Sequence, residues 1–147
     1  MIRMLEDGDN AAWRELWTQY LDFYGSRLDA AVYQRTWSRL LDPAEPVHGA
    51  LSFAGGEAVG LVHYIFHRST WTEGDYCYLQ DLFVAPALRG GGHGKALIAH
   101  VYAEATAAGA SRVHWLTHEN NATAIALYEQ VAERPGFIQF RKTIIAK

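Results

Sequence analysis

Apolar side chains in the first third of the chain recur with helical spacing in two segments. Residues 2–5 form a short apolar run that we expect to be a first strand. Asp9 or Asn10 can then cap a helix that continues to about residue 24, and a second helix is expected at residues 29–41. In the first helix, the side chains that we assign to the core are Trp13, Leu16 and Trp17, and those that can either pack in the core or line a cleft are Tyr20, Phe23 and Tyr24.

From residue 48 onward, apolar and polar positions alternate with a period of two. This pattern predicts a hairpin of two strands at residues 48–53 and 58–67, and then a third antiparallel strand at residues 76–84. Helical spacing returns at residues 95–108. The remaining expected elements are a strand at 112–117 that pairs in parallel with the strand at 76–84, a helix from 121 or 122 to 132, and a final strand at 137–145.

This order of elements predicts an α/β fold of the α+β type. We expect a mixed, mostly antiparallel sheet with helices on both faces. With 147 residues the chain is long enough to bury a core and too short for two domains, so one domain at residues 1–147 is expected. Half of the residues are hydrophobic, which is typical of a globular protein and not of a disordered one.

Charge and composition narrow the classes of function. The net charge is −3 and no basic patch is visible, which disfavours nucleic acid as a partner and fits a cationic partner slightly better. Neither a signal peptide nor an apolar run of membrane-spanning length is present, so we expect a cytoplasmic protein without a membrane partner. Cys77 is the only cysteine, and we interpret it as a packed thiol and not as a nucleophile. His114 and His118 are four residues apart in a strand and its exit, where this spacing does not make two side chains converge, so no metal site is expected.

The junction before residue 95 contains a dense run of glycine. The sequence Arg89-Gly90-Gly91-Gly92-His93-Gly94 leads from a strand into the helix that we expect to begin at Lys95. Unpaired N–H groups and the positive end of the helix dipole converge at such a helix start, and they suit a phosphate or pyrophosphate. Arg89 adds a fixed positive charge that can hold a phosphate with two parallel hydrogen bonds.

Two common phosphate-binding patterns do not fit this loop. The GxGxxG pattern fails because Lys95 or Leu97 stands where its third glycine belongs. The Walker pattern fails because Arg89 occupies the position of its first glycine and Ala96 that of its Ser or Thr. What remains is Arg-x-x-Gly-x-Gly, which ends at Gly94. From the loop alone, a plain glycine turn between a strand and a helix is an equally good interpretation.

Two patterns in the chain resemble hallmarks of the GNAT family of N-acetyltransferases. Arg-x-x-Gly-x-Gly at residues 89–94 resembles the family's acetyl-CoA signature, and Asn-x-x-Ala-x-x-Leu-Tyr at residues 121–128, followed by Gly-Phe at 136–137, resembles its second hallmark. They stand in the family's order and cover roughly the C-terminal half, whereas the N-terminal half matches only in element order. Three further segments are similar to sequences of the branch that acetylates polyamines or histone-like amines. They are the aromatic first helix, the segment at 67–71 and the spacer at 129–135.

The resemblance implies where acetyl-CoA binds. In this family the pantetheine arm lies where the sheet splays, between the strand before the glycine loop and the strand after the crossover helix. Asn121 would hydrogen-bond this arm from one side. His93 departs from the usual Ile or Val of the family, and we expect it either to loosen the helix start or to add a phosphate contact. The residues expected to contact the cofactor are Leu82, Phe83 and Val84 at the pantetheine amides, and Arg89, Gly90, Gly91, Gly92, His93, Gly94 and Lys95 at the pyrophosphate.

The implied reaction is direct attack of a neutral amine on the thioester carbonyl. It requires a base for the ammonium proton, hydrogen-bond donors for the developing oxyanion, and an acid for the departing thiolate. By resemblance, Tyr128 is the acid and a backbone N–H near Phe83 or Val84 polarises the carbonyl. No covalent intermediate is needed.

The base is less well defined by the sequence. Polyamine acetylases of this family carry Glu-Asp where this chain has Gln80-Asp81, so the role can fall to Asp81, to His63 or His118, or to a chain of waters. Asp81 has the best position, and a carboxylate that caps or orients the loop is an equal alternative for it. We interpret His63 and His118 as structural histidines.

We therefore expect a cytoplasmic, acetyl-CoA-dependent N-acetyltransferase that acts on a primary amine. A polyamine or a lysine-like small amine comes first as acceptor, and a protein lysine or N-terminus second. The rivals are a catalytically silent GNAT-fold sensor that binds acyl-CoA and, more weakly, a nucleotide-binding protein that reuses the loop. GNAT domains often dimerise through C-terminal strands, so a homodimer through residues 137–145 is expected. The acidic residues that favour a cationic acceptor are Glu6, Asp22, Glu73, Asp75, Asp81 and Glu119.

Overall fold

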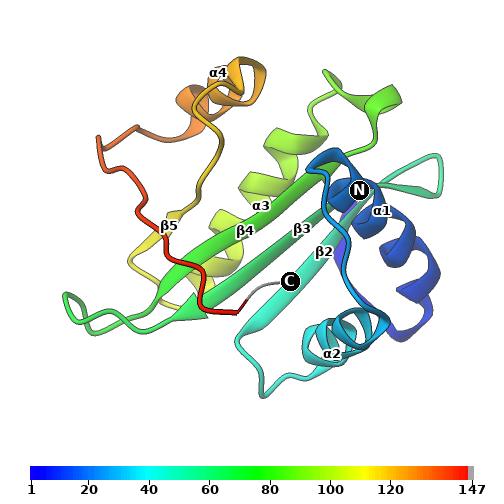
Figure 1. The fold of residues 1–147 in the computed structure, drawn as a ribbon, viewed down its shortest axis with the longest axis horizontal. Helices are drawn as coiled ribbons and strands as arrows, with labels where there is room; N and C mark the ends of the chain where they lie inside the picture. The colour runs from blue at the N-terminus through cyan, green and yellow to red at the C-terminus, as the bar shows by residue number, and fades with distance from the viewer. Residues whose placement is uncertain (146–147) are drawn as a thin grey trace. The chain divides into compact units, whose positions relative to one another are not determined.

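The computed structural model describes residues 1–145, which fall into two compact units that meet between Leu116 and Thr117. The second unit contains helix α4 (Ala122–Val131). The elements of the first unit, in chain order, are β1 (Ile2–Met4), the 3₁₀ turn η1 (Asp7–Asp9), α1 (Asn10–Phe23), α2 (Ala30–Leu41), β2 (Val47–Ala54), β3 (Glu57–His67), β4 (Tyr76–Val84), the 3₁₀ turn η2 (Pro86–Leu88), α3 (His93–Ala107) and β5 (Arg112–His114) (Figure 1).

The five strands form one mixed sheet in the order β1-β2-β3-β4-β5. The first four strands are antiparallel, and β5 pairs in parallel with β4 because α3 crosses between them. Gly55 and Gly56 close the β2–β3 hairpin with φ values of +59° and +79°. Positive φ at both central residues gives the twist that matches the flanking strands. The predicted fold class is confirmed.

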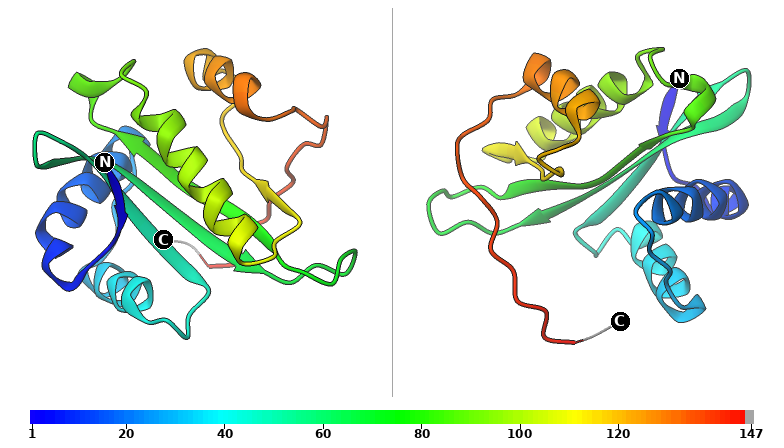
Figure 2. Two further views of the ribbon diagram at one scale, coloured as in Figure 1. Left: turned by 180° about the vertical axis from the view of Figure 1, so that it is seen from behind. Right: turned by 45° about the horizontal axis from the view of Figure 1, so that its top comes forward.

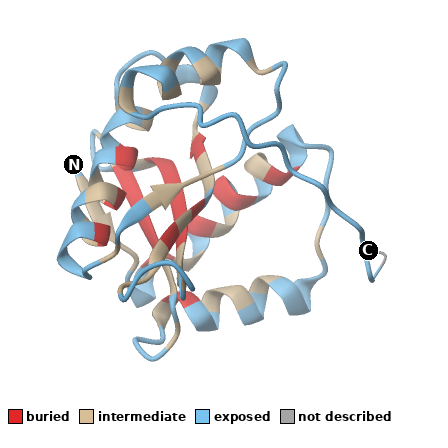
Figure 3. Cartoon of the chain, turned by 90° about the vertical axis from the view of Figure 1, so that its left-hand side faces the viewer, coloured by how far each residue is buried: buried red, intermediate tan, exposed pale blue. Residues whose placement is uncertain are grey.

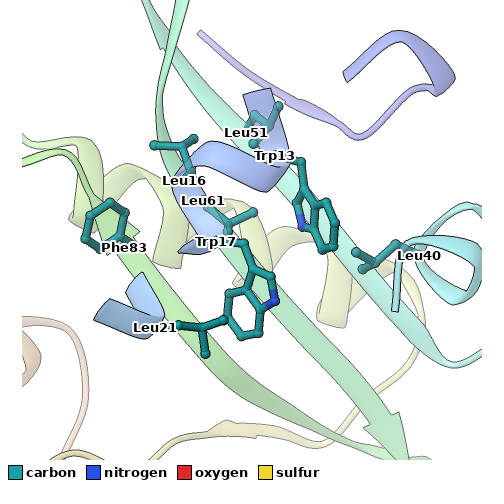
Figure 4. Close-up of a cluster of buried hydrophobic side chains, with 8 residues drawn as sticks. All are labelled: Trp13, Leu16, Trp17, Leu21, Leu40, Leu51, Leu61 and Phe83. Atoms are coloured by element: carbon teal, nitrogen blue, oxygen red, sulfur yellow. The ribbon is translucent and has the colours of Figure 1, made fainter. Parts of the chain in front are cut away.

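Helices cover both faces of this sheet, as Figure 2 shows from two sides. Alternation along β3 divides its side chains between the faces. Leu61 packs in the cluster beneath α1 and α2, whereas the ring of Tyr64 lies 6.3 Å from that of His100 on α3. The buried residues of the cluster beneath α1 and α2 are Trp13, Leu16, Trp17, Leu21, Leu40, Leu51, Leu61 and Phe83 (Figure 4).

The buried residues concentrate on the central strands and on the helix faces turned toward them (Figure 3). The core assignment of Trp13, Leu16 and Trp17 is confirmed. Three aromatic residues near the end of this helix could either pack in the core or line a cleft. In the structure, Tyr20 packs against the cluster, while Phe23 and Tyr24 are exposed. The aromatic face of α1 therefore runs from the core out to the surface.

One irregularity in β4 decides which side chains share a face. His63 pairs with Asp81 but Tyr64 pairs with Leu79, so Gln80 is an extra residue without a partner on β3. Such a bulge changes the alternation of the strand that contains it. Leu79 faces the side of the sheet covered by α3, and Asp81 faces the side covered by α1, although a regular strand would put both on one face.

The pairing of β4 with β5 is short. It covers only Tyr76–Tyr78 against Arg112–His114, whereas β4 continues to Val84. We had expected the fifth strand to extend to residue 117, so its predicted end is wrong. Within the described part of the first unit, the edge of β4 beyond Tyr78 has no paired strand on the β5 side. Apart from the carbonyl of Val84, which accepts a hydrogen bond from Nε of Arg89, the backbone groups of this edge are paired with no described strand on that side and can pair with an extended ligand.

The predicted final strand at 137–145 is wrong: residues 133–145 form neither helix nor strand. Phe137 and Phe140 are 88% and 89% exposed. The alternating pattern supplied the propensity for a strand, but in the structure no described strand edge pairs with this segment. A smaller difference concerns α3, which begins at His93 and not at Lys95.

Candidate functional site

The glycine loop joins β4 to α3 and includes two residues with positive φ. Gly90 and Gly92 have φ values of +83° and +87°, and a Cβ at either position would meet no atom within 4 Å. The first hydrogen bond of α3 runs from the N–H of Ala96 to the carbonyl of Gly92. The N–H groups of residues 93–95 therefore have no acceptor within the helix and are available to a phosphate. The predicted loop geometry is present.

The side chain of His93 has a partner on the sheet that the sequence did not reveal, and its expected phosphate contact stays a prediction. Its Nδ1 lies 2.7 Å from Oγ of Ser52, a residue of β2 that is buried. This hydrogen bond fixes the first residue of α3 to the sheet. The helix start is thus held in place rather than loosened, and this ring nitrogen is already bonded to the protein.

Arg89 lies beside the same loop and is exposed. Its Nε donates a hydrogen bond of 3.0 Å to the carbonyl of Val84. Its guanidinium carbon lies 5.4 Å from the ring centre of Phe23 and 5.6 Å from that of Phe83, within cation–π range. Arg89 thereby connects the cofactor loop, the free edge of β4 and the aromatic end of α1.

Asp81 is paired with His63 on the face of the sheet covered by α1. Oδ2 of Asp81 lies 3.0 Å from Nδ1 of His63, and Nε2 of His63 lies 2.9 Å from Nε1 of Trp13. An indole N–H can only donate, so Nε2 accepts and the proton of the neutral imidazole is on Nδ1, where it is donated to Asp81. His63 is a structural histidine, as expected, with both ring nitrogens bonded.

Aromatic side chains of α1 surround this pair. The ring of Trp17 stacks on Tyr20 at 5.2 Å and meets His63 edge-on at 4.8 Å. Tyr20 lies 4.9 Å from Tyr24 and hydrogen-bonds Asp81. Burial, followed by the nearby charge of Asp81 and this hydrogen bond, raises the pKa of Tyr20, so its hydroxyl stays protonated and acts as a donor. From the sequence, Trp13 was assigned to the core and Tyr20 was left between the core and a cleft, so their hydrogen bonds in this network were not expected.

Asn121 and Tyr128 lie in the second unit, on one helix. Asn121 caps α4: its Oδ1 accepts a hydrogen bond of 3.3 Å from the N–H of Ala124. Tyr128 lies seven residues further on, two turns along the same face, and is half-buried. The predicted helix is confirmed, and its cap at Asn121 is a finding of the structure. The roles of both residues toward acetyl-CoA remain predictions.

The family of the chain is shown by its match to a known protein family. Residues 9–132 match the model of the acetyltransferase (GNAT) family, which covers most of the chain. The chain belongs to the GNAT family. It is an N-acetyltransferase by that membership, and the resemblance of the two sequence hallmarks is confirmed.

Two similar sequences are acetyltransferases of small amines. The D-amino-acid N-acetyltransferase of Saccharomyces cerevisiae is 32% identical over 144 residues, covering 97% of this chain and 89% of the yeast protein. The thialysine N-ε-acetyltransferase of Caenorhabditis elegans is 34% identical over 100 residues, covering 65% of this chain and 62% of the nematode protein.

Solved structures confirm the fold of this acetyltransferase. A crystal structure of a probable acetyltransferase aligns with a TM-score of 0.87 at 20% identity, covering 100% of this chain and 99% of the other. An aminoglycoside N-acetyltransferase solved in complex with CoA aligns with a TM-score of 0.84 at 20% identity, covering 99% of this chain and 95% of that one. At this identity the likeness establishes the fold alone.

Other candidate groups of the acetyltransferase have partners of their own. Asp75 forms an ion pair with Arg68 at 3.2 Å, which partly neutralises one carboxylate of the expected acidic set. Nε2 of His114 lies 2.9 Å from Nε2 of His67.

Burial raises the pKa of the Cys77 thiol to about 11, in keeping with a packed thiol. Within residues 1–145 no three His, Cys, Asp or Glu side chains form a metal-binding group, and no helix is long and apolar enough to cross a membrane.

Proposed function

We propose that this protein transfers the acetyl group of acetyl-CoA to the primary amine of a small, positively charged acceptor. The observation that carries the proposal is the fixed carboxylate of Asp81, which lies on β4 three residues past the last pair with β5. It stands next to the free edge formed by residues 82–84, among aromatic side chains. A carboxylate beside aromatic rings is suited to an ammonium group.

The cofactor would bind along this edge and at the loop that follows it. The backbone of Leu82, Phe83 and Val84 would pair with the pantetheine amides, and the N–H groups of residues 93–95 with the pyrophosphate. Arg89 would leave the carbonyl of Val84 to reach a phosphate. Asn121 would complete the contacts with the arm. These assignments follow the family pattern and fit the conformation of the loop.

The reaction would proceed by direct attack. The acceptor ammonium gives up a proton toward Asp81, and the neutral nitrogen forms a C–N bond with the carbonyl carbon as the C–S bond breaks. Tyr128 would give a proton to the departing sulfur, and the second proton of the acceptor nitrogen would restore the phenol, so that the amide, the CoA thiol and one proton on Asp81 remain. Backbone N–H groups near Phe83 or Val84 would stabilise the oxyanion.

The two similar enzymes narrow the acceptor class. Both are named for amines that carry an amino-acid backbone, one D-amino acids and the other thialysine. We therefore place lysine-like amines and basic D-amino acids first, ahead of polyamines and of a protein lysine. The two aromatic side chains at the exposed end of α1, Phe23 and Tyr24, would contact the part of the acceptor beyond its amine.

The test is the release of CoA thiol from acetyl-CoA in the presence of an acceptor panel. The panel contains thialysine, lysine, spermidine, and D-amino acids with basic, neutral and acidic side chains. We expect turnover with basic acceptors and a loss of about 10²-fold or more in Asp81→Asn. Asp75→Asn removes a carboxylate that precedes the same strand and pairs with Arg68, and it serves as the matched control, with wild-type activity expected. Turnover of only neutral or acidic acceptors would contradict the acceptor class.

A catalytically silent acyl-CoA sensor is the alternative, and Tyr128→Phe separates it from an enzyme. An enzyme loses kcat in this variant and keeps its affinity for CoA, whereas a sensor has no turnover to lose. Binding is measured by calorimetry with CoA, and competition by ATP in the same titration tests the weaker nucleotide-binding alternative.

The homodimer and the cytoplasmic location also stay proposals. Five large apolar side chains of residues 137–145, at positions 137, 138, 140, 144 and 145, are exposed, which supports burial against a second copy. Light scattering after gel filtration should give twice the monomer mass for the wild type and the monomer mass for Phe137→Ser/Phe140→Ser. A monomeric wild type would contradict the dimer.

A further inference from the structure

We propose that His63 is a positioning residue that holds Asp81 in place for the acceptor amine, and that Trp13 fixes the tautomer in which it does so. This inference rests on the proposed function, in which Asp81 meets the acceptor. It concerns a chain of three side chains from three elements: Trp13 on α1, His63 on β3 and Asp81 on β4.

The chain runs from the core to the surface. Trp13 is 0% exposed, and the side chains of His63 and Asp81 are 4% and 12% exposed. Only the carboxylate end can therefore reach a substrate. Because Trp13 donates to Nε2, the single proton of the neutral ring is on Nδ1 and is donated to Oδ2 of Asp81. The orientation of the carboxylate is thus set from within the core.

The same geometry prevents His63 from acting as the base. A second proton would have to enter at Nε2, where it would face the N–H of Trp13 and break the 2.9 Å hydrogen bond. The ring is enclosed by Trp17 at 4.8 Å, and Cδ2 lies 3.3 Å from the place where a Cβ on Gly49 would be. His63 is thereby confined to donating one hydrogen bond to Asp81.

Few other polar groups face this chain. From α1, the hydroxyl of Tyr20 donates to Asp81, and from β4 the phenol of Tyr78 interacts with the same carboxylate. From β2, Gly49 packs against the imidazole and brings no charge. His63 and Tyr20 together hold Asp81 from two sides. A buried polar pair of this kind is costly in an apolar cluster unless every member is bonded, and here each one is.

Two substitutions of His63 separate its two hydrogen bonds. In His63→Asn the amide nitrogen replaces Nδ1 and can still donate to Asp81, whereas the bond from Trp13 is lost. In His63→Gln the longer side chain reaches the position of Nε2 and can accept from Trp13, whereas the donor to Asp81 is lost. We expect His63→Asn to keep kcat/KM for the amine within about threefold and His63→Gln to lose about 10- to 100-fold, mainly in kcat, because a displaced catalytic group costs rate more than affinity. The KM for acetyl-CoA should stay unchanged in both variants.

Trp13→Phe tests the tautomer, with Trp17→Phe as its matched control. Both indoles pack against His63 from α1, but within residues 1–145 the buried Nε1 of Trp17 has no hydrogen-bond partner. Trp13→Phe removes the donor to Nε2, so the ring can adopt the tautomer with its proton on Nε2, in which it no longer donates to Asp81. We therefore expect Trp13→Phe to lower kcat/KM for the amine as His63→Gln does. Trp17→Phe, which removes no hydrogen bond from His63, should lower it less.

A measurement on the wild-type protein tests the geometry without any variant. Long-range ¹H–¹⁵N spectra should show His63 protonated on Nδ1 and unprotonated on Nε2 from pH 6 to 8. An Nε2–H tautomer, or equal losses of activity in His63→Asn and His63→Gln, would overturn the inference. If Asp81→Asn keeps full activity, it is the proposed function that fails, and the spectra still report separately on the tautomer.

Discussion

Gly92 offers a quantitative test of the cofactor loop. It is the N-cap of α3 and has a φ of +87°, a conformation that costs an L-residue about 1–2 kcal/mol. No atom lies within 4 Å of an added Cβ, so the cost of Gly92→Ala is conformational and not steric. Gly91 is the comparison position, because its φ lies outside the positive range; an added Cβ there would lie 3.2 Å from the carbonyl oxygen of Leu88, so its cost is steric and not conformational.

The conformational energy of Gly92→Ala should be detectable in one of two measurements. If the loop keeps its conformation, the free energy of unfolding falls by about 1–2 kcal/mol and the Kd for CoA stays unchanged. If the loop relaxes, stability is kept and the Kd rises by about 5- to 30-fold, since 1.4 kcal/mol corresponds to a factor of ten. The two effects together should account for the full cost.

Urea unfolding and calorimetric titration with CoA measure the two quantities on the same samples. Gly92→Asn should lie between the wild type and Gly92→Ala, because Asn tolerates positive φ better than Ala does. Gly91→Ala should change both quantities less than Gly92→Ala. If Gly92→Ala leaves stability and Kd unchanged, or if Gly91→Ala has the larger effect, the reasoning about this loop is wrong.

Three further predictions concern the first unit. Arg3 donates hydrogen bonds of 2.7 and 2.9 Å to Asp9, and these are the largest cause that holds the pKa of that carboxyl below its usual 3.8. The stability that ionised Asp9 contributes is complete above pH 3.8 and is lost as the pH falls through the lower pKa of the folded state. In Asp9→Asn, the free energy of unfolding by urea should therefore depend less on pH across this range. Cys77, with its pKa raised to about 11 by burial, should resist thiol reagents at pH 8 in the folded protein and react on unfolding; fast modification of the native state would contradict this. Gly49→Ala would place a Cβ 2.6 Å from Cδ1 of Leu5 and should lower the free energy of unfolding by about 1–3 kcal/mol, as measured by urea titration; a neutral effect would show that Leu5 can move aside.

The sequence predicted best those elements that are bounded by strong local signals. The strand at 76–84 and the helix that begins after Asn121 were found because turn residues and glycine mark the ends of such elements. The glycine loop was recognised for the same reason. Local chemistry determines these features, so a single sequence contains enough information to find them.

The predictions were wrong where the local structure depends on a contact with a residue distant in the sequence. Residues 137–145 alternate like a strand, but pairing requires an available edge, which periodicity cannot reveal. The bulge at Gln80 likewise depends on the register of β3 against β4. The bond from Trp13 to His63 joins residues 50 positions apart, and an indole in a predicted core shows no sign of being a donor. Asp81 was singled out from its place beside the motif, but the network that holds it required the fold.

The extra residue Gln80 in β4 matters for protein design, if the face of the sheet that carries Asp81 is to be copied onto another sheet. A strictly regular strand that offers Leu79 to one helical layer would offer Asp81 to the same layer, and a carboxylate would then be buried beneath α3. Because Gln80 lies between them without a partner on β3, Leu79 packs in the apolar layer beneath α3, whereas Asp81 faces α1, on the side where we propose that the acceptor amine binds. If the side chains were copied onto a regular strand without the bulge, Asp81 would face α3 instead of α1.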